Sequence, residues 1–327
     1  MSSAAPSLYP LRFEPIYQNR PWGGRRFADL LTAPLPAGLV GEAWLLSDRD
    51  DHQSQVANGP LTGQTIGALL KQWPVEMLGS LAGRFPRFPL LLKFLDARDM
   101  LSVQVHPSDS QAAELGTGDS GKTEAWVVLE AAPESRIYAG VKPGTTAGEL
   151  RRALSGTEIT NLLACFSPRA GDGVLLPAGT VHAFGGGIVV FEVQQNSDLT
   201  FRLYDWDRAD PATGRPRELQ VDQALACTDF AAGPVVPVVP VGDELFRCEQ
   251  FGLRRLSGAT RFEVGAEGMP RILVCIGGEG DLEHDEQRFG VGKGDVVLLP
   301  AAVGVCAFAP GVPATLLEVS LPEGSTP

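Results

Sequence analysis

The stretch GDGVLLPAGTVHAFGGGIVVFEVQQNSDLTFRLYDWDR (171–208) decides the fold. It contains three strand-like runs, 174–179, 188–195 and 199–206, and each is short and rich in apolar residues. Gly, Pro, Asn, Ser and Asp residues lie between these runs or at their ends. Short apolar runs bounded by such turn-forming residues predict β-strands. The stretch therefore predicts a β-rich fold.

The same pattern continues on both sides of this stretch. Upstream, the almost unbroken apolar run 88–97 predicts a buried strand, and the runs 101–106 and 123–130 predict two more. Downstream, several short strand-like runs follow one another between residues 246 and 320. Many short strands joined by turns that contain Gly and Pro indicate a β-barrel or a β-sandwich.

Two segments of the sequence resemble each other. GDGVLLPAGTVHAF (171–184) is echoed by GDVVLLPAAVGVCAF (294–308), which is one residue longer. The position of His182 falls near Val305 or Cys306 in the second segment, so that segment carries no histidine. The echo predicts two related β-modules, of which only the first can hold a metal through this histidine.

A Pro-rich segment, AAGPVVPVVP (231–240), fits no packed element and predicts a linker. The expected organisation is a metal-binding catalytic domain with helical insertions over 1–230, the linker, and a degenerate β domain over 241–327. A few short helices are expected, including one at 64–72 with Thr62 as its cap.

Composition excludes several classes of protein. With 327 residues, 44% of them apolar, the chain is long enough for one large or two medium folded domains. No apolar run approaches the roughly 20 residues that a membrane span needs. The net charge of −12 opposes binding to nucleic acid. It does not oppose binding of a small anionic substrate, because a few basic groups can make a pocket positive.

The five cysteines are odd in number, scattered, and form no CxxC pair. They predict free thiols in a reducing compartment. The N-terminus lacks the basic and apolar segments of a signal peptide, so a cytoplasmic location is expected. Nothing in the sequence indicates the oligomeric state.

Four residues form a candidate metal site. Gln104 and His106 share one face of the predicted strand 101–106, and Glu124 and His182 lie on or beside other predicted strands. Two histidines and a carboxylate suit a divalent metal such as zinc. The alternative is that both histidines are half-buried and satisfied by hydrogen bonds, and residue types alone do not decide between the two. Gln104 is a rarer ligand and could be a polar pocket residue.

Three basic residues are candidates for the same pocket. Lys93 lies inside an apolar strand, where a lysine needs a partner or a task, unless its stem reaches the surface. Arg202 could instead pair with an aspartate of the following turn. Lys122 could be an ordinary turn lysine, and Asp198 could be only a turn residue.

Several separate motifs carry a resemblance to a known family. Residues 171–182, from Gly171 through Pro177 to His182, resemble the second cupin motif, although Gly186 stands where that motif has an asparagine. Together with further motifs in the same order, this segment resembles the type I phosphomannose isomerases, specifically their shorter bacterial form. The further motifs are PWGG (21–24), GEAWLLS (41–47), QVHP (104–107), GKTE (121–124) and QQNSDLTFRLYDWDR (194–208).

The resemblance runs from Pro21 to about Arg208 and implies a fold, a cofactor and an activity. The fold is mainly β, with two cupin-type β-barrel or jelly-roll modules, the second degenerate and metal-free. The cofactor is one zinc ion per chain, and the activity is interconversion of mannose 6-phosphate and fructose 6-phosphate. The implied zinc ligands are Gln104, His106, Glu124 and His182. The implied active-site residues are Arg202, Lys122 and Lys93.

Such an isomerisation passes through an enediolate, so the site must stabilise negative charge and move a proton between C1 and C2. A metal ion and Arg202 suit the first task. The base remains open among Lys93, Lys122, Asp198 and a water molecule on the metal. The lysines and Asp198 are also candidates for binding the substrate, whose phosphate needs cationic or N–H donors.

Three other functions remain open at this point. The chain could be a cupin isomerase acting on another or an unphosphorylated sugar. It could be another metal-dependent cupin enzyme, such as an iron oxygenase. It could also be a non-catalytic sugar-binding cupin, although such a protein need not keep a complete ligand set.

Overall fold

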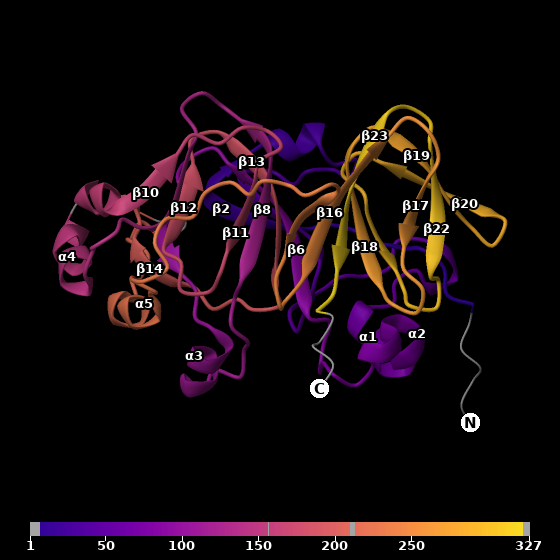
Figure 1. Cartoon of the computed structure of the whole chain (residues 1–327), viewed down its shortest axis with the longest axis horizontal. Coiled ribbons are helices and arrows are strands. Elements are labelled where there is room, and N and C mark those ends of the chain that lie inside the picture. The colour runs from indigo at the N-terminus through magenta and orange to yellow at the C-terminus, as the bar shows by residue number, and fades with distance from the viewer. Residues whose placement is uncertain (1–6, 156, 210–212, 323–327) are drawn as a thin grey trace.

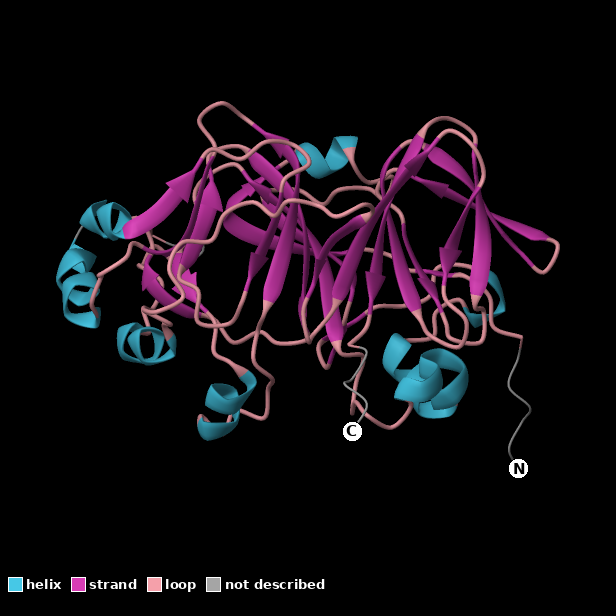
Figure 2. Ribbon diagram, viewed as in Figure 1, coloured by secondary structure: helices cyan, strands magenta, loops and turns pink. Residues whose placement is uncertain are grey.

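The computed structural model describes residues 7–155, 157–209 and 213–322, and it is mainly β, as predicted (Figures 1 and 2). Four antiparallel sheets contain nearly all of the strands. Sheet 1 has the order β10 (Leu163–Phe166), β9 (Arg136–Val141), β12 (His182–Gly185), β7 (Val103–Val105), β14 (Phe201–Tyr204). Sheet 2 has the order β11 (Gly173–Leu176), β8 (Glu124–Ala131), β13 (Ile188–Gln195), β6 (Leu90–Ala97), β2 (Ile16–Gly24), β3 (Val40–Leu46).

The other two large sheets form the C-terminal lobe, orange to yellow in Figure 1, except for the N-terminal strand β1. Sheet 3 has the order β1 (Leu11–Arg12), β21 (Val296–Leu299), β18 (Arg271–Gly277), β23 (Ala314–Ser320), β16 (Gly252–Gly258), β15 (Glu244–Arg247). Sheet 4 has the order β17 (Phe262–Gly265), β22 (Val305–Pro310), β19 (Glu279–His284), β20 (Gln287–Gly292). A small hairpin joins β4 (Asp48–Arg49) to β5 (His52–Gln53).

Helices are short and lie outside the sheets (Figure 2). The α-helices are α1 (Ile66–Gln72), α2 (Pro74–Leu78), α3 (Asp109–Glu114), α4 (Ala147–Arg152) and α5 (Val221–Cys227). The 3₁₀ turns are η1 (Arg26–Asp29), η2 (Gly59–Leu61), η3 (Gly79–Leu81), η4 (Ala153–Ser155) and η5 (Thr157–Leu162). No described helix is both long enough and apolar enough to cross a membrane.

The expected helix near residue 64 is present, but its cap is Thr65 and not Thr62. The Thr65 hydroxyl oxygen accepts a hydrogen bond from the backbone N–H of Ala68. Thr62 lies in the preceding 3₁₀ turn, where its hydroxyl donates to the Gly59 carbonyl. The helix therefore begins at Ile66, two residues later than the apolar pattern predicts.

Sheet 2 is the central layer, because side chains on its two faces enter different cores. On β13, Phe191 and Val193 belong to the large core that sheet 2 shares with sheet 3. Ile188 and Val190 belong to the core between sheets 2 and 1, together with Phe184 of β12. Successive residues of a strand point to opposite faces. The apolar residues 188–191 of β13, on both faces of the strand, thus reflect a strand that is buried on both sides.

The expected modules were cupin-type β-barrels or jelly rolls, and in the described part of the chain the facing sheets stay open and form no closed barrel. At the free edge of β14, Arg202 bonds to Gln220 instead of to a strand of sheet 2. The backbone N–H of Gln220 donates to the Arg202 carbonyl at 2.9 Å. Short-range sequence patterns indicate strands but do not encode how sheet edges are paired. The open edge leaves room for a pocket between β14 and β2.

The two ends of the chain meet in sheet 3. Leu11 and Arg12 of β1 pair with Leu298 and Val297 of β21. The Pro-rich segment 231–240 also makes specific contacts. Its Val235 and Val238 N–H groups donate to the carbonyls of Ala139 and Gly173, and so tie the segment to sheets 1 and 2.

Candidate active site

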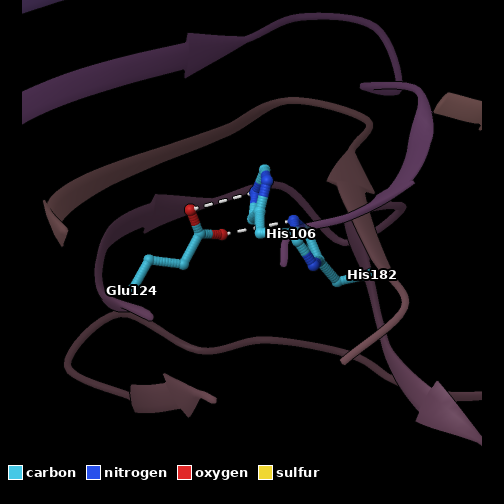
Figure 3. Close-up of side chains that lie close together, drawn as sticks. All are labelled: His106, Glu124 and His182. Carbon is cyan, nitrogen blue, oxygen red and sulfur yellow. Dashed lines mark ion pairs between the residues drawn. The ribbon is translucent and has the colours of Figure 1, made fainter. Parts of the chain in front are cut away.

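Two histidines and a glutamate converge between sheets 1 and 2 (Figure 3). His106 follows β7, His182 begins β12, and Glu124 begins β8. Nε2 of His106 lies 3.4 Å from Oε2 of Glu124, and Nε2 of His182 lies 3.2 Å from Oε1. The three candidate ligand atoms lie within 4.8 Å of one another, and all three residues are buried. The cluster that the sequence predicted is therefore assembled in space.

Hydrogen bonds fix the orientation of both imidazole rings. Nδ1 of His106 donates to the Leu199 carbonyl at 2.8 Å, and Nδ1 of His182 donates to the Thr180 carbonyl at 2.9 Å. A carbonyl only accepts, so each Nδ1 carries the proton and each Nε2 presents a lone pair toward Glu124. This arrangement is typical of histidines that bind a metal.

The protonation states also suit a metal. Burial and the nearby Lys122 charge lower the pKa of His106 to about 3, against the opposing effect of Glu124. Burial likewise lowers the pKa of His182. Burial alone would raise the pKa of Glu124, but the charges of Lys122 and the two histidines hold it well below its usual value. Near pH 7 the histidines are neutral and the glutamate is ionised, which are the forms that bind metals.

The carboxylate of Glu124 has unmet hydrogen-bonding capacity. Both of its oxygens are buried, and neither accepts a well-formed hydrogen bond from the described residues. The Lys122 ammonium, 2.8 Å from Oε2, forms an ion pair with it. Burying acceptors without partners is costly, and a cation between Glu124 and the two histidines would supply the missing interaction. The residues present therefore fit a divalent metal ion.

Gln104 lies beside this cluster. Its Nε2 is 3.3 Å from Nε2 of His182, and its Oε1 accepts a hydrogen bond from the Ser102 hydroxyl. The assignment of amide oxygen and nitrogen rests on the hydrogen-bond network. To bind a metal, Gln104 would have to turn its amide so that the oxygen faces the cluster.

A pocket of about 500 Å³ lies next to the cluster, between sheets 1 and 2. Lys93, Lys122, Gln104, Asp198 and Arg202, which were singled out from the sequence, all line it. Its cationic residues are Arg20, Lys93, Lys122, Arg202 and Arg217. Its carboxylates are Glu42, Glu192 and Asp198. Five cations against three carboxylates make this a pocket suited to an anionic ligand, although the whole protein is acidic.

Comparison with known proteins decides the family. A family model for the catalytic domain of type I phosphomannose isomerase matches residues 11–127. Over 305 residues the chain is 36% identical to the mannose-6-phosphate isomerase ManA of Bacillus subtilis, with 90% of this chain and 94% of that protein covered. The chain belongs to the type I phosphomannose isomerase family. It is therefore an enzyme of the isomerase class.

Other relatives of this phosphomannose isomerase agree. A mannose-6-phosphate isomerase of Streptococcus mutans serotype c is 32% identical over 306 residues, which cover 90% of this chain and 93% of that protein. The crystal structure of the mannose 6-phosphate isomerase from Bacillus subtilis superimposes with a TM-score of 0.86 at 29% identity. It covers 95% of this chain and 99% of that chain.

Lys93 of the isomerase is buried and does not reach the protein surface. Its ammonium lies 3.5 Å from Oε1 of Glu192 and 3.8 Å from Oε2 of Glu42. It also lies 5.2 Å from the centre of the Trp44 ring. Two carboxylates and an aromatic face therefore stabilise this buried cation.

Lys122 contacts two residues of the candidate metal cluster. Its ammonium is 2.8 Å from Oε2 of Glu124 and 3.1 Å from Nε2 of His106. Burial alone would lower the pKa of Lys122, but the charges of Glu124 and Glu192 outweigh burial and raise it. The sequence left Lys122 as one candidate for the base, a role that requires a lowered pKa. The raised pKa instead describes a lysine that stays protonated.

Arg202 lies on β14 directly opposite Gln104 on β7. Its Nε is buried without a hydrogen-bond partner among the described residues. Asp198 is exposed on the pocket wall, and its backbone N–H donates to Oδ2 of Asp119. Asp119 is itself held by two hydrogen bonds from Arg49. Asp198 is thus a positioned wall residue and not part of the buried cluster.

Two buried carboxylates were missed in the sequence. Glu42 accepts hydrogen bonds from Arg20 and from Nε1 of Trp44, and Glu192 accepts one from Nε1 of Trp126. Glu192 interrupts the apolar run 188–195 as Lys93 interrupts 88–97, so the argument applied to the lysine would also have found it. Glu42 carried a weaker signal, because the segment GEAWLLS (41–47) around it is less uniformly apolar.

Glu42 should make the stability of the isomerase sensitive to acid. Burial alone would raise the pKa of Glu42, but Lys93 and Arg20 lower it from 4.5 to about 2. Its stabilising contribution is complete above the unfolded value near 4.5 and is lost as the pH falls toward 2. We expect Glu42→Gln to remove about 3 kcal/mol of this pH dependence.

Urea unfolding of both proteins at pH 6, 5, 4 and 3 measures this difference. The gap in the free energy of unfolding between wild type and Glu42→Gln should narrow as the pH falls. A gap that stays constant over this range would show that Glu42 has an ordinary pKa in the folded protein.

Proposed function

We propose that this enzyme interconverts mannose 6-phosphate and fructose 6-phosphate, with one zinc ion held by His106, Glu124 and His182 and with Gln104 as a fourth ligand. The observation that carries the proposal is the buried His–Glu–His cluster beside a pocket with five cationic residues. Nitrogen and carboxylate ligands suit zinc, and three or four protein ligands leave a position for a substrate oxygen. The relatives named mannose-6-phosphate isomerase supply the choice of sugar.

The residues of this chain divide the work of such a reaction. When bound, a divalent metal supplies positive charge that stabilises the negative charge developing on the sugar oxygens. Arg202 is placed to add to this stabilisation, because it lies opposite Gln104 and has no carboxylate bound to it in the described chain. Lys122, protonated and close to Glu124, can donate a hydrogen bond to a substrate oxygen. Lys93 is held by its carboxylates as a second such donor.

Proton transfer between C1 and C2 needs a base whose pKa lies near the working pH. Glu192 meets this requirement better than Lys122. Burial and the charge of Glu124 raise the pKa of Glu192 from its acidic value toward neutrality. The pKa of Lys122 is raised as well, but from a basic value, so it moves further from neutrality. Glu192 also lines the pocket, and its buried Oε1 accepts no hydrogen bond from the described residues. On this placement we assign proton transfer to Glu192, and we leave Asp198 as a residue that contacts the sugar from the pocket wall.

We also propose that the chain consists of two related cupin-type modules, the second without a metal site. In each copy of the internal echo, the first strand lies in an inner sheet and the second lies in an outer sheet. These strands are β11 and β12 in the first copy and β21 and β22 in the second. Val305 begins β22 as His182 begins β12, so the histidine position is filled by an apolar residue. The proposed division is 1–230, the segment 231–240, and 241–327.

A coupled assay tests the reaction and the cofactor together. Fructose 6-phosphate formed from mannose 6-phosphate is measured for the purified protein, after exhaustive chelation, and after zinc is added back. We expect activity to be lost on chelation and restored by zinc. Activity that survives complete metal removal would overturn the metal's role. A folded, zinc-loaded protein without activity would favour the alternatives, another sugar or a non-catalytic sugar-binding protein. The free cysteines support a cytoplasmic location.

A further inference from the structure

The turn after β14 has an unusual backbone. Trp206 and Asp207 have φ values of 58° and 54°, in the left-handed region that residues other than glycine avoid. The backbone N–H of Arg208 donates to the Asp205 carbonyl and closes the turn. Nε1 of Trp206 donates to the Leu101 carbonyl at 2.6 Å. Strained turns that side chains hold in place are found where a precise position is needed.

The residue presented by this turn is Asp205, which is buried. Its Oδ2 accepts a hydrogen bond from Nε of Arg217 at 2.7 Å, and its Oδ1 accepts one from Nη2 of Arg217 at 2.6 Å. Nη2 of Arg208 donates to the same Oδ1 at 2.5 Å. The two-point contact fixes the plane of the Arg217 guanidinium, and Arg217 lines the pocket.

The order of strands places Arg217 at the far end of the pocket from the metal cluster. His182 is on β12, Gln104 is on the adjacent β7, and Arg202 is on β14, the next strand. The chain then returns along the free edge of β14, where Gln220 bonds to Arg202. Each strand adds a step of about 5 Å. A hexose 6-phosphate likewise carries its phosphate at the opposite end of its carbon chain from C1 and C2.

Positive charge is in excess at this end of the pocket. On the other side, Arg20, Lys93 and Lys122 face three carboxylates, those of Glu42, Glu192 and Glu124. Around the turn, Arg208 and Arg217 both form ion pairs with Asp205, whereas the buried Nε of Arg202 has no hydrogen-bond partner among the described residues. Of these groups, the two arginines Arg202 and Arg217 and the single carboxylate of Asp198 line the pocket. Asp207, in the same turn, is exposed, accepts a hydrogen bond from the Tyr204 hydroxyl and does not line the pocket. An anionic group bound here would balance that charge.

We propose that Arg217 binds the phosphate of the substrate and determines the preference for phosphorylated over unphosphorylated sugar, and that Asp205 is the positioning residue that holds Arg217 for this task. The inference rests on the proposed function for the identity of the sugar. Arg202, one strand nearer the metal cluster, acts on the reacting end.

The test compares Arg217→Ala, Arg217→Lys and Asp205→Asn with the wild type, all loaded with zinc. Arg261→Ala serves as the matched control, because it removes an exposed, ion-paired arginine that directly precedes β17 in the C-terminal lobe. The KM and kcat for mannose 6-phosphate are measured, with inorganic phosphate as a competing anion. We expect KM to rise about 10- to 100-fold in Arg217→Ala, with a smaller change in kcat and weaker inhibition by phosphate. Arg217→Lys should recover part of the loss.

Asp205→Asn should raise KM in the same direction as Arg217→Ala, while turnover of unphosphorylated mannose, where measurable, stays at the wild-type rate. A merely structural role for Asp205 would lower thermal stability and affect both sugars equally. If the wild type is active and Arg217→Ala has the same KM and the same inhibition by phosphate, the inference is overturned. An unchanged KM in Asp205→Asn alone would overturn the positioning role. A wild type without activity would instead defeat the proposed function, and calorimetric titration with inorganic phosphate would still compare wild type with Arg217→Ala.

Discussion

Replacing His182 with alanine should abolish metal binding and reduce turnover of mannose 6-phosphate by about 1000-fold or more. His182 presents Nε2 to Glu124 from the start of β12, with its ring orientation fixed by the Thr180 carbonyl. Without it, Glu124, His106 and the weaker ligand Gln104 provide too few strong ligands to hold a zinc ion tightly. Metal content measured by elemental analysis and kcat measured in the coupled assay should fall together.

His284→Ala is the matched control, because His284 ends β19 in the C-terminal lobe and lies outside the cluster. This variant should keep the metal content and the activity of the wild type. If His182→Ala kept both its metal and its activity, the site would have been placed wrongly. Circular dichroism and a melting curve separate loss of metal from loss of fold.

Replacing Arg202 with alanine should leave the metal in place but lower kcat about 100- to 1000-fold. The guanidinium lies beside Gln104 and has an unpaired, buried Nε. A cation that stabilises charge only in the transition state affects kcat, whereas one that holds the phosphate equally in both states affects KM. Arg202 and Arg217 should therefore give opposite kinetic signatures.

The measurement is a full kinetic analysis of Arg202→Ala and Arg202→Lys at matched metal content. The lysine variant should keep part of the rate, because it keeps a charge but loses the planar fork of donors. Loss of metal or of cooperative unfolding in Arg202→Ala would assign this arginine a structural role. The backbone bonds of Arg202 to Gln220 are retained in both variants, so they do not account for any loss.

Strands were easier to predict than the way in which they associate. The run 188–195 forms β13 over the same residues, because a strand buried on both faces is mostly apolar and stands out in the sequence. Pairing at sheet edges depends on residues far apart in sequence, such as Arg202 with Gln220. The mainly β class was therefore predictable, whereas the sequence did not show that the sheets form no closed barrel in the described part of the chain.

The parts of the pocket were predictable to different degrees. His106 and His182 stood out because histidines are few and occur within recognisable motifs, and the structure brings them to Glu124. Arg217 gave no signal, because it lies in a polar, Gly- and Pro-containing loop. Only the folded turn at Trp206 and Asp207 shows that Arg217 donates hydrogen bonds to Asp205. Contacts of this kind arise from backbone geometry that composition does not specify.

The pairing of β1 with β21 has a consequence for how the chain acquires its structure during synthesis. Leu11 of β1 can pair with Leu298 of β21 only after 287 further residues (298 − 11) have been synthesised. Until then, the edge of sheet 3 that β1 forms cannot assemble. Domains commonly fold from the N-terminus as the ribosome releases them, and distant pairings are slow to form. Here sheet 2, which carries Glu124, keeps one face uncovered until the C-terminal strands emerge. The nascent chain therefore exposes this apolar face from the completion of β13 until the C-terminal strands emerge, and the C-terminal lobe completes the fold of the half that carries the pocket.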